Sequence, residues 1–301
     1  MKAWIAYELG RRFLGEVPDG VEVEVFDGDT PPDPAGVEFW APPFLAGPDT
    51  VDLLSALPDL RVVQLMTAGV DPWLGRIPDG VVLCDARGVH DSATSEWAAT
   101  AILTYLRSFP AFVRAQADRR WTREITDELA GKRVLIVGAG AIGTALAARL
   151  APFEVELTLV ARTARDGVHG VGELPALLPH ADVVVLTVPQ TPETVGLVDA
   201  AFLRALPDRA LLVNAARGTV VDTAALVAEC ASGRIGAALD VTDPEPLPAD
   251  HPLWTMPNVL ITPHVGSSVR GILPRAFRLV GEQLRRYAAG DDLHNVVTGG
   301  Y

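Results

Sequence analysis

The chain of 301 residues is poor in cysteine and has no long apolar run. Its 2 cysteines, Cys84 and Cys230, are too few for a disulfide framework, and cysteine and histidine show no spacing typical of a metal site. We therefore expect no bound metal and, because both cysteines lie in apolar segments, inert thiols. No apolar run is long enough to span a membrane, and the first residues, MKAWIAYELG, lack the apolar core of a signal peptide. The sequence predicts a cytoplasmic protein with no membrane partner.

Positive charge is also scarce. Lysine and arginine total 25 against 38 aspartates and glutamates, which gives a formal net charge of -13. The field of such a molecule repels polyanions, so nucleic acid is not an expected partner. A small anionic ligand must then be attracted by individual positive groups, which directs attention to single arginines.

What the chain does have is an α/β pattern in two stretches that meet near Asp91. Short β-rich runs alternate with turn residues in the first stretch and with helical segments in the second. Near-continuous apolar strands of this kind are typical of parallel sheets covered by helices on both faces. Strands are expected in the first stretch at residues 2–9, 21–26, 37–42, 60–66 and 81–86, and in the second at 133–137, 155–161, 182–188, 210–214, 235–239 and 259–262.

Helices frame the second stretch. Residues 92–108 have apolar positions at helical spacing and predict a long helix just after a hinge. Residues 269–289 are amphipathic and end at Gly290, which predicts a last helix that packs back on the first lobe. The residues after Gly290 are expected to form a tail.

A glycine-rich segment follows the apolar strand RVLIV and opens a helical run. Its order is Gly138, Ala139, Gly140, Ala141, Ile142, Gly143. The first glycine permits a tight turn, the second lets the backbone approach a pyrophosphate, and the third lets helix and strand pack closely. We interpret this segment as a dinucleotide site and expect Gly138, Gly140, Ala141, Ile142 and Gly143 to contact the cofactor.

The end of the next strand indicates which dinucleotide binds. NAD enzymes usually carry an acid there for the ribose 2′-hydroxyl, whereas this chain reads Ala161, Arg162, Thr163, Ala164, Arg165. Two guanidinium groups and the Thr163 hydroxyl can hold a 2′-phosphate, which favours NADP(H). Alternatively, one arginine stacks on adenine and the other is a solvated loop charge, in which case NAD(H) is also used.

Three polar residues follow later strands, at the edge where ligands bind in such sheets. They are Arg217 in NAARGTVVD, Glu245 in DVTDPEPLP and His264 in ITPHVGSS. Alone, His264 reads as an ordinary loop histidine and Glu245 as a solvated acid. Together they supply what reduction of a 2-oxo acid needs, namely a cation for the carboxylate and carbonyl, a proton donor, and a carboxylate that keeps the donor protonated.

At this point the chain resembles the D-isomer-specific 2-hydroxyacid dehydrogenase family, over almost its whole length, and in particular glyoxylate/hydroxypyruvate reductases. The segments that carry the resemblance are QLMTAGVD at 64–71, the 138–143 glycine segment, TVPQTPET at 187–194, NAARGTVVD at 214–222, ALDVTDPEPLP at 238–248 and TPHVGSS at 262–268. The resemblance implies a flavodoxin-like substrate domain, residues 1–90 and 270–301, and a Rossmann cofactor domain, residues 91–269.

The resemblance also implies roles for residues. Arg217 binds substrate, His264 is the acid/base next to cofactor and substrate, and Glu245 is its partner. Asp240 lies by the nicotinamide carboxamide, and the backbone of Ala68, Gly69 and Val70 holds the substrate carboxylate. The further cofactor contacts that it implies are Val188, Pro189, Thr194 and Ala215.

The expected reaction is hydride transfer between NADP(H) and a short 2-oxo or 2-hydroxy acid, with glyoxylate or hydroxypyruvate first and phenylpyruvate as a larger alternative. Phe44, Leu45 and Met66 are candidates for the substrate pocket, while Thr242 departs from the aromatic residue common in the family. Two other functions stay open. One is an NAD-dependent catabolic dehydrogenase, and the other is a cofactor-sensing regulatory protein.

Trp121 suggests an oligomer. It lies where family members often carry an arm that reaches a second subunit, so the resemblance implies a homodimer through the cofactor domain. The alternative is that Trp121 covers the core of its own chain.

Overall fold

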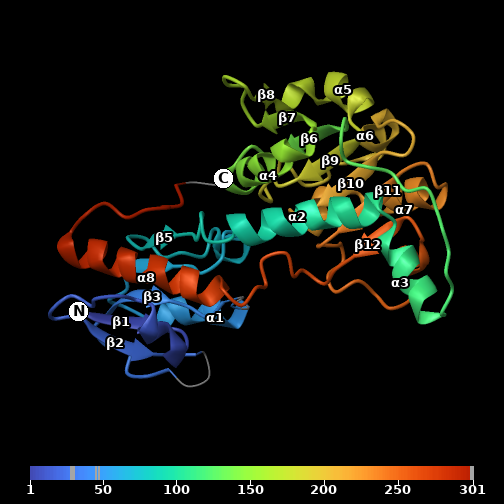
Figure 1. Cartoon of the computed structure of the whole chain (residues 1–301). Helices are drawn as coiled ribbons and strands as arrows, with labels where there is room; N and C mark the ends of the chain where they lie inside the picture. The colour runs from blue at the N-terminus through green and yellow to red at the C-terminus, as the bar shows by residue number, and fades with distance from the viewer. Residues whose placement is uncertain (28–30, 45, 47, 299–301) are drawn as a thin grey trace. The chain divides into compact units, whose positions relative to one another are not determined.

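The computed structural model describes residues 1–27, 31–44, 46 and 48–298. The chain divides into two compact units, Met1–His90 with Val269–Tyr301, and Asp91–Ser268. Each unit is built on its own sheet (Figure 1). Within the described residues, no helix is both long and apolar enough to cross a membrane.

The first unit contains a five-stranded parallel sheet. Its order is β2-β1-β3-β4-β5, which is the flavodoxin-like order 2-1-3-4-5. All five strands expected from the apolar runs are present, each shorter than its run. The strands are β1 (Lys2–Ile5), β2 (Glu22–Val25), β3 (Val37–Ala41), β4 (Val62–Gln64) and β5 (Val82–Cys84).

Helices cover this sheet. The last helix, α8 (Ile272–Ala289), lies along the sheet (Figure 1), and its apolar residues Phe277, Val280 and Leu284 belong to the core shared with the strands, as the sequence predicts. It ends at Gly290, whose φ of 74° gives the left-handed cap that glycine favours. The other helical segments of this unit are α1 (Pro48–Asp52) and the 3₁₀ turns Glu8–Arg12, Leu53–Ala56 and Asp71–Trp73.

Residues 291–298 do not form a tail, and that part of the prediction is wrong. Val297 donates its backbone N–H to the Leu83 carbonyl (2.9 Å), and the Asn295 carbonyl accepts from the Asp85 N–H (3.0 Å), which ties the segment to β5. The side chain of Gln283 on α8, which is fully buried, donates to the His294 carbonyl (2.8 Å). These backbone pairings lie beside a sheet edge and have no apolar signature in the sequence.

The second unit contains a seven-stranded parallel sheet of order β12-β11-β10-β9-β6-β7-β8. Counted from β6, this is the Rossmann order 3-2-1-4-5-6 with one further strand, and the order reverses between β6 and β9. All six expected strands are present. The strands are β6 (Arg133–Val137), β7 (Glu156–Ala161), β8 (His169–Gly170), β9 (Val183–Leu186), β10 (Leu211–Asn214), β11 (Gly236–Leu239) and β12 (Val259–Ile261). The sequence does not predict β8, because two residues at a sheet edge carry no apolar run.

Both faces of this sheet are covered, as a parallel sheet requires. Helices α2 and α4 lie side by side on one face and α6 and α7 on the other (Figure 1), each face with its own apolar core. The α-helices are α2 (Asp91–Leu106), α3 (Phe109–Ala117), α4 (Ala141–Leu150), α5 (Leu174–Leu177), α6 (Ala200–Ala205) and α7 (Thr223–Ala231). The 3₁₀ turns are Ala151–Phe153, Val171–Glu173, Leu178–His180, Gly218–Val220 and Pro252–Thr255.

Both cysteines are buried, Cys84 on β5 of the first unit and Cys230 in a core of the second. Burial raises the pKa of the Cys84 thiol, and likewise that of Cys230, to about 12. Neither thiol therefore ionises near neutral pH. Only the ionised thiol, the thiolate, acts as a nucleophile.

Candidate active site

The glycine-rich loop joins β6 to α4 and is shaped by close backbone contacts. Gly138 has a φ of 118°, and a Cβ on it would come 2.6 Å from the Thr187 carbonyl carbon. A Cβ on Gly143 would come 2.1 Å from the Gly138 carbonyl oxygen. Gly140 differs, since a Cβ there would meet no atom within 4 Å among the described residues. Two glycines are thus required by packing, and the middle one faces open space.

The start of α4 offers backbone donors to a ligand. The N–H groups of Gly138 and Ala139 donate to the Val160 carbonyl (2.8 and 2.9 Å), which fixes the loop against β7. The N-cap residue, Gly140, has no side chain that could accept from the first turn of the helix. Free N–H groups and the helix dipole favour an anion here. This cradle fits the pyrophosphate of a dinucleotide.

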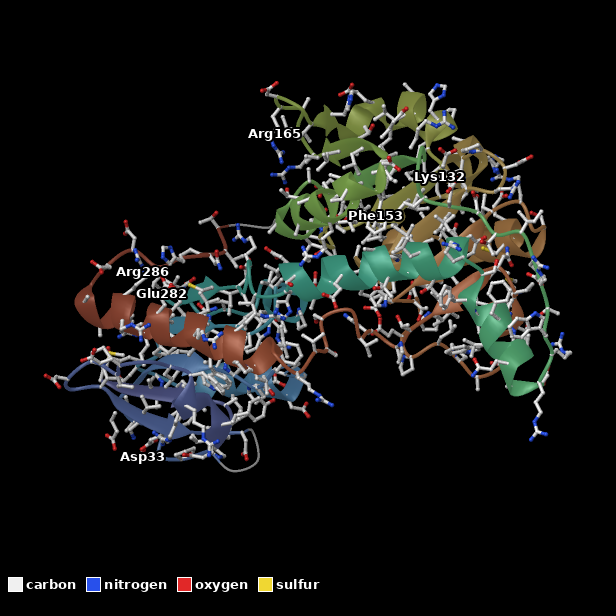
Figure 2. All side chains as sticks on the ribbon, viewed as in Figure 1. Asp33, Lys132, Phe153, Arg165, Glu282 and Arg286 are labelled. Carbon is white, nitrogen blue, oxygen red and sulfur yellow. The ribbon has the colours of Figure 1, made fainter. Side chains whose placement is uncertain are left out.

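The loop after β7 carries two arginines, Arg162 and Arg165, both exposed. Arg165 and Val168 exchange both backbone hydrogen bonds (2.9 and 2.8 Å), which closes a tight turn. The Arg165 guanidinium donates through Nη2 to the Ala139 carbonyl (2.7 Å) of the glycine-rich loop. Figure 2 labels Arg165 on this turn. Arg162 also acts on Glu193, whose pKa is lowered chiefly by a hydrogen bond from Thr191 and to a smaller extent by the Arg162 charge.

Hydrogen bonds within the loop after β9 fix its conformation. The Thr194 hydroxyl donates to the Pro189 carbonyl (2.7 Å) and accepts from the Thr191 N–H (2.8 Å). Thr187, which the sequence argument did not single out, donates to the Gly138 carbonyl (2.8 Å) and joins this loop to the glycine-rich loop. Val188 packs against the apolar core on the α6 and α7 face of the sheet.

Arg217 follows β10 on a turn that Asn214 stabilises. The buried Asn214 amide donates to the Arg217 carbonyl (2.9 Å) and accepts from the Ala216 N–H (3.0 Å). The Arg217 guanidinium donates to the Ala216 carbonyl (2.8 Å). A Cβ on Gly218 would come 1.9 Å from the Thr242 carbonyl oxygen, so this turn lies directly against the loop that leads to Glu245. The preceding residue, Ala215, donates its N–H to the Leu186 carbonyl of β9 (3.1 Å).

Glu245 and His264 form a pair. The two side chains are 42 % and 41 % exposed, and His264 Nδ1 lies 2.6 Å from Glu245 Oε1. Hydrogen bonds hold the Glu245 loop, since the Thr223 hydroxyl donates to the Asp243 carbonyl (2.8 Å) and the Thr242 hydroxyl to the Pro244 carbonyl (2.9 Å). A carboxylate on Nδ1 stabilises the imidazolium and leaves Nε2 for another partner. This is the arrangement of a general acid/base.

Asp240 is buried at the end of β11 and is 5 % exposed. Its carboxylate accepts from the Thr262 hydroxyl (2.6 Å) and from the N–H groups of Val265 (2.9 Å) and Gly266 (2.7 Å). The resemblance implies that Asp240 lies beside a nicotinamide, and the sequence does not indicate a role for Thr262. Hydrogen bonds to backbone N–H groups leave no residue-type signal that could have revealed this arrangement.

The first unit contains the other predicted residues. Ala68, Gly69 and Val70 come just after β4, in a turn where the Thr67 hydroxyl donates to the Gly69 carbonyl (2.9 Å). The Phe44 ring stacks on His90 with centroids 5.9 Å apart.

Met66 is 2 % exposed and belongs to the apolar core of this sheet, so its role as a wall of the substrate pocket stays a prediction. Leu45 lies outside the described residues.

Comparisons with known proteins identify the family of the chain. The family described as D-isomer specific 2-hydroxyacid dehydrogenase, NAD binding domain, matches residues 99–266. Glyoxylate reductase of Thermofilum pendens is 34 % identical over 257 residues, which cover 80 % of this chain and 75 % of the relative. D-3-phosphoglycerate dehydrogenase of Archaeoglobus fulgidus is 30 % identical over 257 residues, 82 % of this chain but 49 % of the relative.

A solved structure shows the same fold over the whole chain. It is the NADPH-dependent glyoxylate/hydroxypyruvate reductase of Sinorhizobium meliloti in complex with NADP and sulfate, with a TM-score of 0.85 and 29 % identity over 100 % of this chain and 99 % of that one. The chain belongs to the D-isomer specific 2-hydroxyacid dehydrogenase family and is an NAD(P)-dependent oxidoreductase acting on the CH–OH group of 2-hydroxy acids.

Proposed function

We propose that this chain is an NADP(H)-preferring 2-oxoacid reductase that forms a D-2-hydroxy acid, with glyoxylate or hydroxypyruvate as its first substrates. The observation that carries the proposal is the pairing of His264 with Glu245 at 2.6 Å on the sheet edge that also bears the glycine-rich loop and Arg217. That edge is where ligands bind in doubly wound sheets. The unit Asp91–Ser268 is proposed as the cofactor domain and the other unit as the substrate domain.

The residues of this chain can divide the work of reduction. When bound, the nicotinamide supplies the hydride for the carbonyl carbon. Arg217 neutralises the substrate carboxylate and polarises the carbonyl. That the backbone of residues 68–70 also binds the carboxylate stays a prediction. His264 gives the proton on Nε2 to the developing alkoxide, and Glu245 stabilises the imidazolium until that proton leaves. Asp240, Ala215 and the loop 188–194 line the proposed nicotinamide side.

The loop after β7 supports the preference for NADP(H). Arg165 already lies on the glycine-rich loop through its bond to the Ala139 carbonyl, and no acid occupies the end of β7. An adenosine 2′-phosphate at that loop meets Arg165, Arg162 and the Thr163 hydroxyl, and guanidinium groups are good bidentate partners for phosphate.

The double substitution Arg162→Ala, Arg165→Ala tests this preference. We expect KM for NADPH to rise by about 10- to 100-fold. Hydrogen bonds to charged groups contribute about 1.5–3 kcal/mol, and the exposure of both arginines keeps their combined contribution within that range. KM for NADH, which has no 2′-phosphate, should change much less. Initial rates at varied cofactor concentration measure both, and Arg204→Ala, an exposed arginine on α6, is the control. Equal changes with NADPH and NADH would remove the 2′-phosphate assignment.

The direct test of function is the initial rate of NADPH and of NADH oxidation by the purified protein with glyoxylate, hydroxypyruvate, pyruvate and phenylpyruvate. We expect an NADPH-dependent rate with glyoxylate or hydroxypyruvate. A higher rate with NAD and a D-2-hydroxy acid would favour a catabolic dehydrogenase. The absence of turnover with every oxo acid would favour the cofactor-sensing protein.

We also propose that the chain forms a homodimer through α3 and the segment that follows it. Trp121 is 96 % exposed and Ile125 104 % exposed, so neither covers the core of its own chain. Phe109 and Val113 on α3 are more than half exposed as well. Several large exposed apolar side chains in one stretch of the chain favour an interaction surface there. A cytoplasmic location stays a prediction from the sequence.

Trp121→Asp tests the dimer. An aromatic anchor at an interface is worth about 2 kcal/mol or more, so we expect the dimer dissociation constant to rise by at least about 30-fold. Analytical ultracentrifugation over a concentration series measures it. Phe153→Asp, which removes a 41 % exposed aromatic from another surface, is the control. A wild-type protein that is monomeric at all concentrations would contradict the proposal.

A further inference from the structure

A chain of hydrogen bonds runs from helix α2 to the loop that carries His264. The indole Nε1–H of Trp97 donates to the Thr262 hydroxyl (3.0 Å), and that hydroxyl donates to Asp240 Oδ1 (2.6 Å). Trp97 and Thr262 are 165 residues apart in the sequence. The directions of both bonds are fixed, because an indole only donates and a hydroxyl has a single proton. With Trp97 donating to it, Thr262 must give its proton to the carboxylate.

Asp240 in turn holds the backbone on both sides of His264. Its main-chain carbonyl accepts from the His264 N–H (2.7 Å). Its carboxylate accepts from the N–H groups of Val265 (2.9 Å) and Gly266 (2.7 Å). A Cβ on Gly266 would come 2.7 Å from Asp240 Oδ2 and 3.5 Å from Trp97 Cγ, so the loop is packed against both side chains.

The backbone of His264 needs such support. Its φ of 52° lies in the left-handed region, which costs a residue with a Cβ about 1–2 kcal/mol. Conformations of this kind persist where the surroundings over-determine them. The contact with Glu245 cannot do so alone, because both side chains are about 40 % exposed and exposed ion pairs contribute about 0–1 kcal/mol. The buried hydrogen bonds of Asp240 are therefore the main restraint on this loop.

We propose that Trp97 is a positioning residue for His264, acting through Thr262 and Asp240. The proposal rests on the function proposed above for His264. Without the indole N–H, the Thr262 hydroxyl is free to rotate, and Asp240 Oδ1 loses the donor that orients it toward the Val265 N–H. The ring of His264 then samples orientations in which Nε2 does not point at the substrate oxygen.

The Trp97→Phe variant keeps an aromatic ring and removes the donor. We expect kcat for glyoxylate reduction with NADPH to fall by about 5- to 10-fold, the equivalent of one hydrogen bond, because a misplaced proton donor slows the step it serves. KM for glyoxylate and KM for NADPH should be unchanged, since Trp97 is proposed to bind neither. Trp4→Phe removes an indole N–H that donates to Glu24 (3.0 Å) in the other unit and is the matched control, with kcat unchanged.

Two further measurements test the positioning role of Trp97. If the residues act in series, Trp97→Phe combined with Thr262→Val lowers kcat no further than Thr262→Val alone. Amide hydrogen exchange reads the loop without any turnover, and we expect the Val265 and Gly266 amides to exchange about 5- to 10-fold faster in Trp97→Phe. Unchanged exchange at these amides, or additive losses in the double variant, would overturn the positioning role. A wild-type protein that reduces no 2-oxo acid would refute the proposed function, while the exchange result would still decide the restraint on the loop.

Discussion

The His264→Gln variant is expected to lose about 10²- to 10⁴-fold in kcat/KM for reduction of glyoxylate, the range that a positioned general acid contributes. Glutamine is close to histidine in size and can still reach toward Glu245, but it cannot transfer a proton. The substitution thus separates the proton step from the packing of the loop. Steady-state kinetics with NADPH measure the loss.

Two controls define this result. KM for NADPH should change little, because the glycine-rich loop and the arginines after β7 are untouched. Amide exchange at Val265 and Gly266 should stay near that of the wild type, since Asp240 still holds the backbone. A His264→Gln variant with near wild-type kcat/KM would mean that another group supplies the proton.

The strands could be predicted from sequence because a buried parallel strand must be apolar nearly throughout. The runs RVLIV and DVVVL predict β6 and β9 in that way. The same signal fails for β8, where His169 and Gly170 pair at an edge that needs no apolar side chain. It also fails for the segment around Val297, whose attachment to β5 uses backbone groups and the buried Gln283.

The sequence predicts part of the candidate site. Arg217, Glu245 and His264 could be proposed because each follows a strand, and the carboxyl ends of parallel strands meet at one edge. The residues that hold them in place could not be predicted. Asp240 acts through backbone N–H groups, and Trp97 meets Thr262 only because the packing of α2 on the sheet brings two distant segments together. The spacing of residues within a single segment does not indicate such a contact.

Replacement of Arg217 with alanine should abolish most activity while leaving the fold intact. We expect kcat/KM for glyoxylate to fall by about 10²- to 10³-fold, the cost of losing a donor aimed at developing negative charge. Stability should change by only about 0.5–1.5 kcal/mol, because the turn around Arg217 is held by Asn214, whose two hydrogen bonds to backbone survive the substitution. Thermal unfolding and kinetics on the same preparation measure both.

Arg217→Lys distinguishes charge from geometry. Lysine keeps the positive charge but loses the planar pair of donors that a carboxylate accepts, so it should recover only part of the activity lost in Arg217→Ala. Full recovery would mean that the charge alone attracts the substrate, which a molecule with a net charge of -13 otherwise repels. A wild-type kcat/KM in Arg217→Ala would remove Arg217 from the site, because no other contact proposed in this unit neutralises the substrate carboxylate.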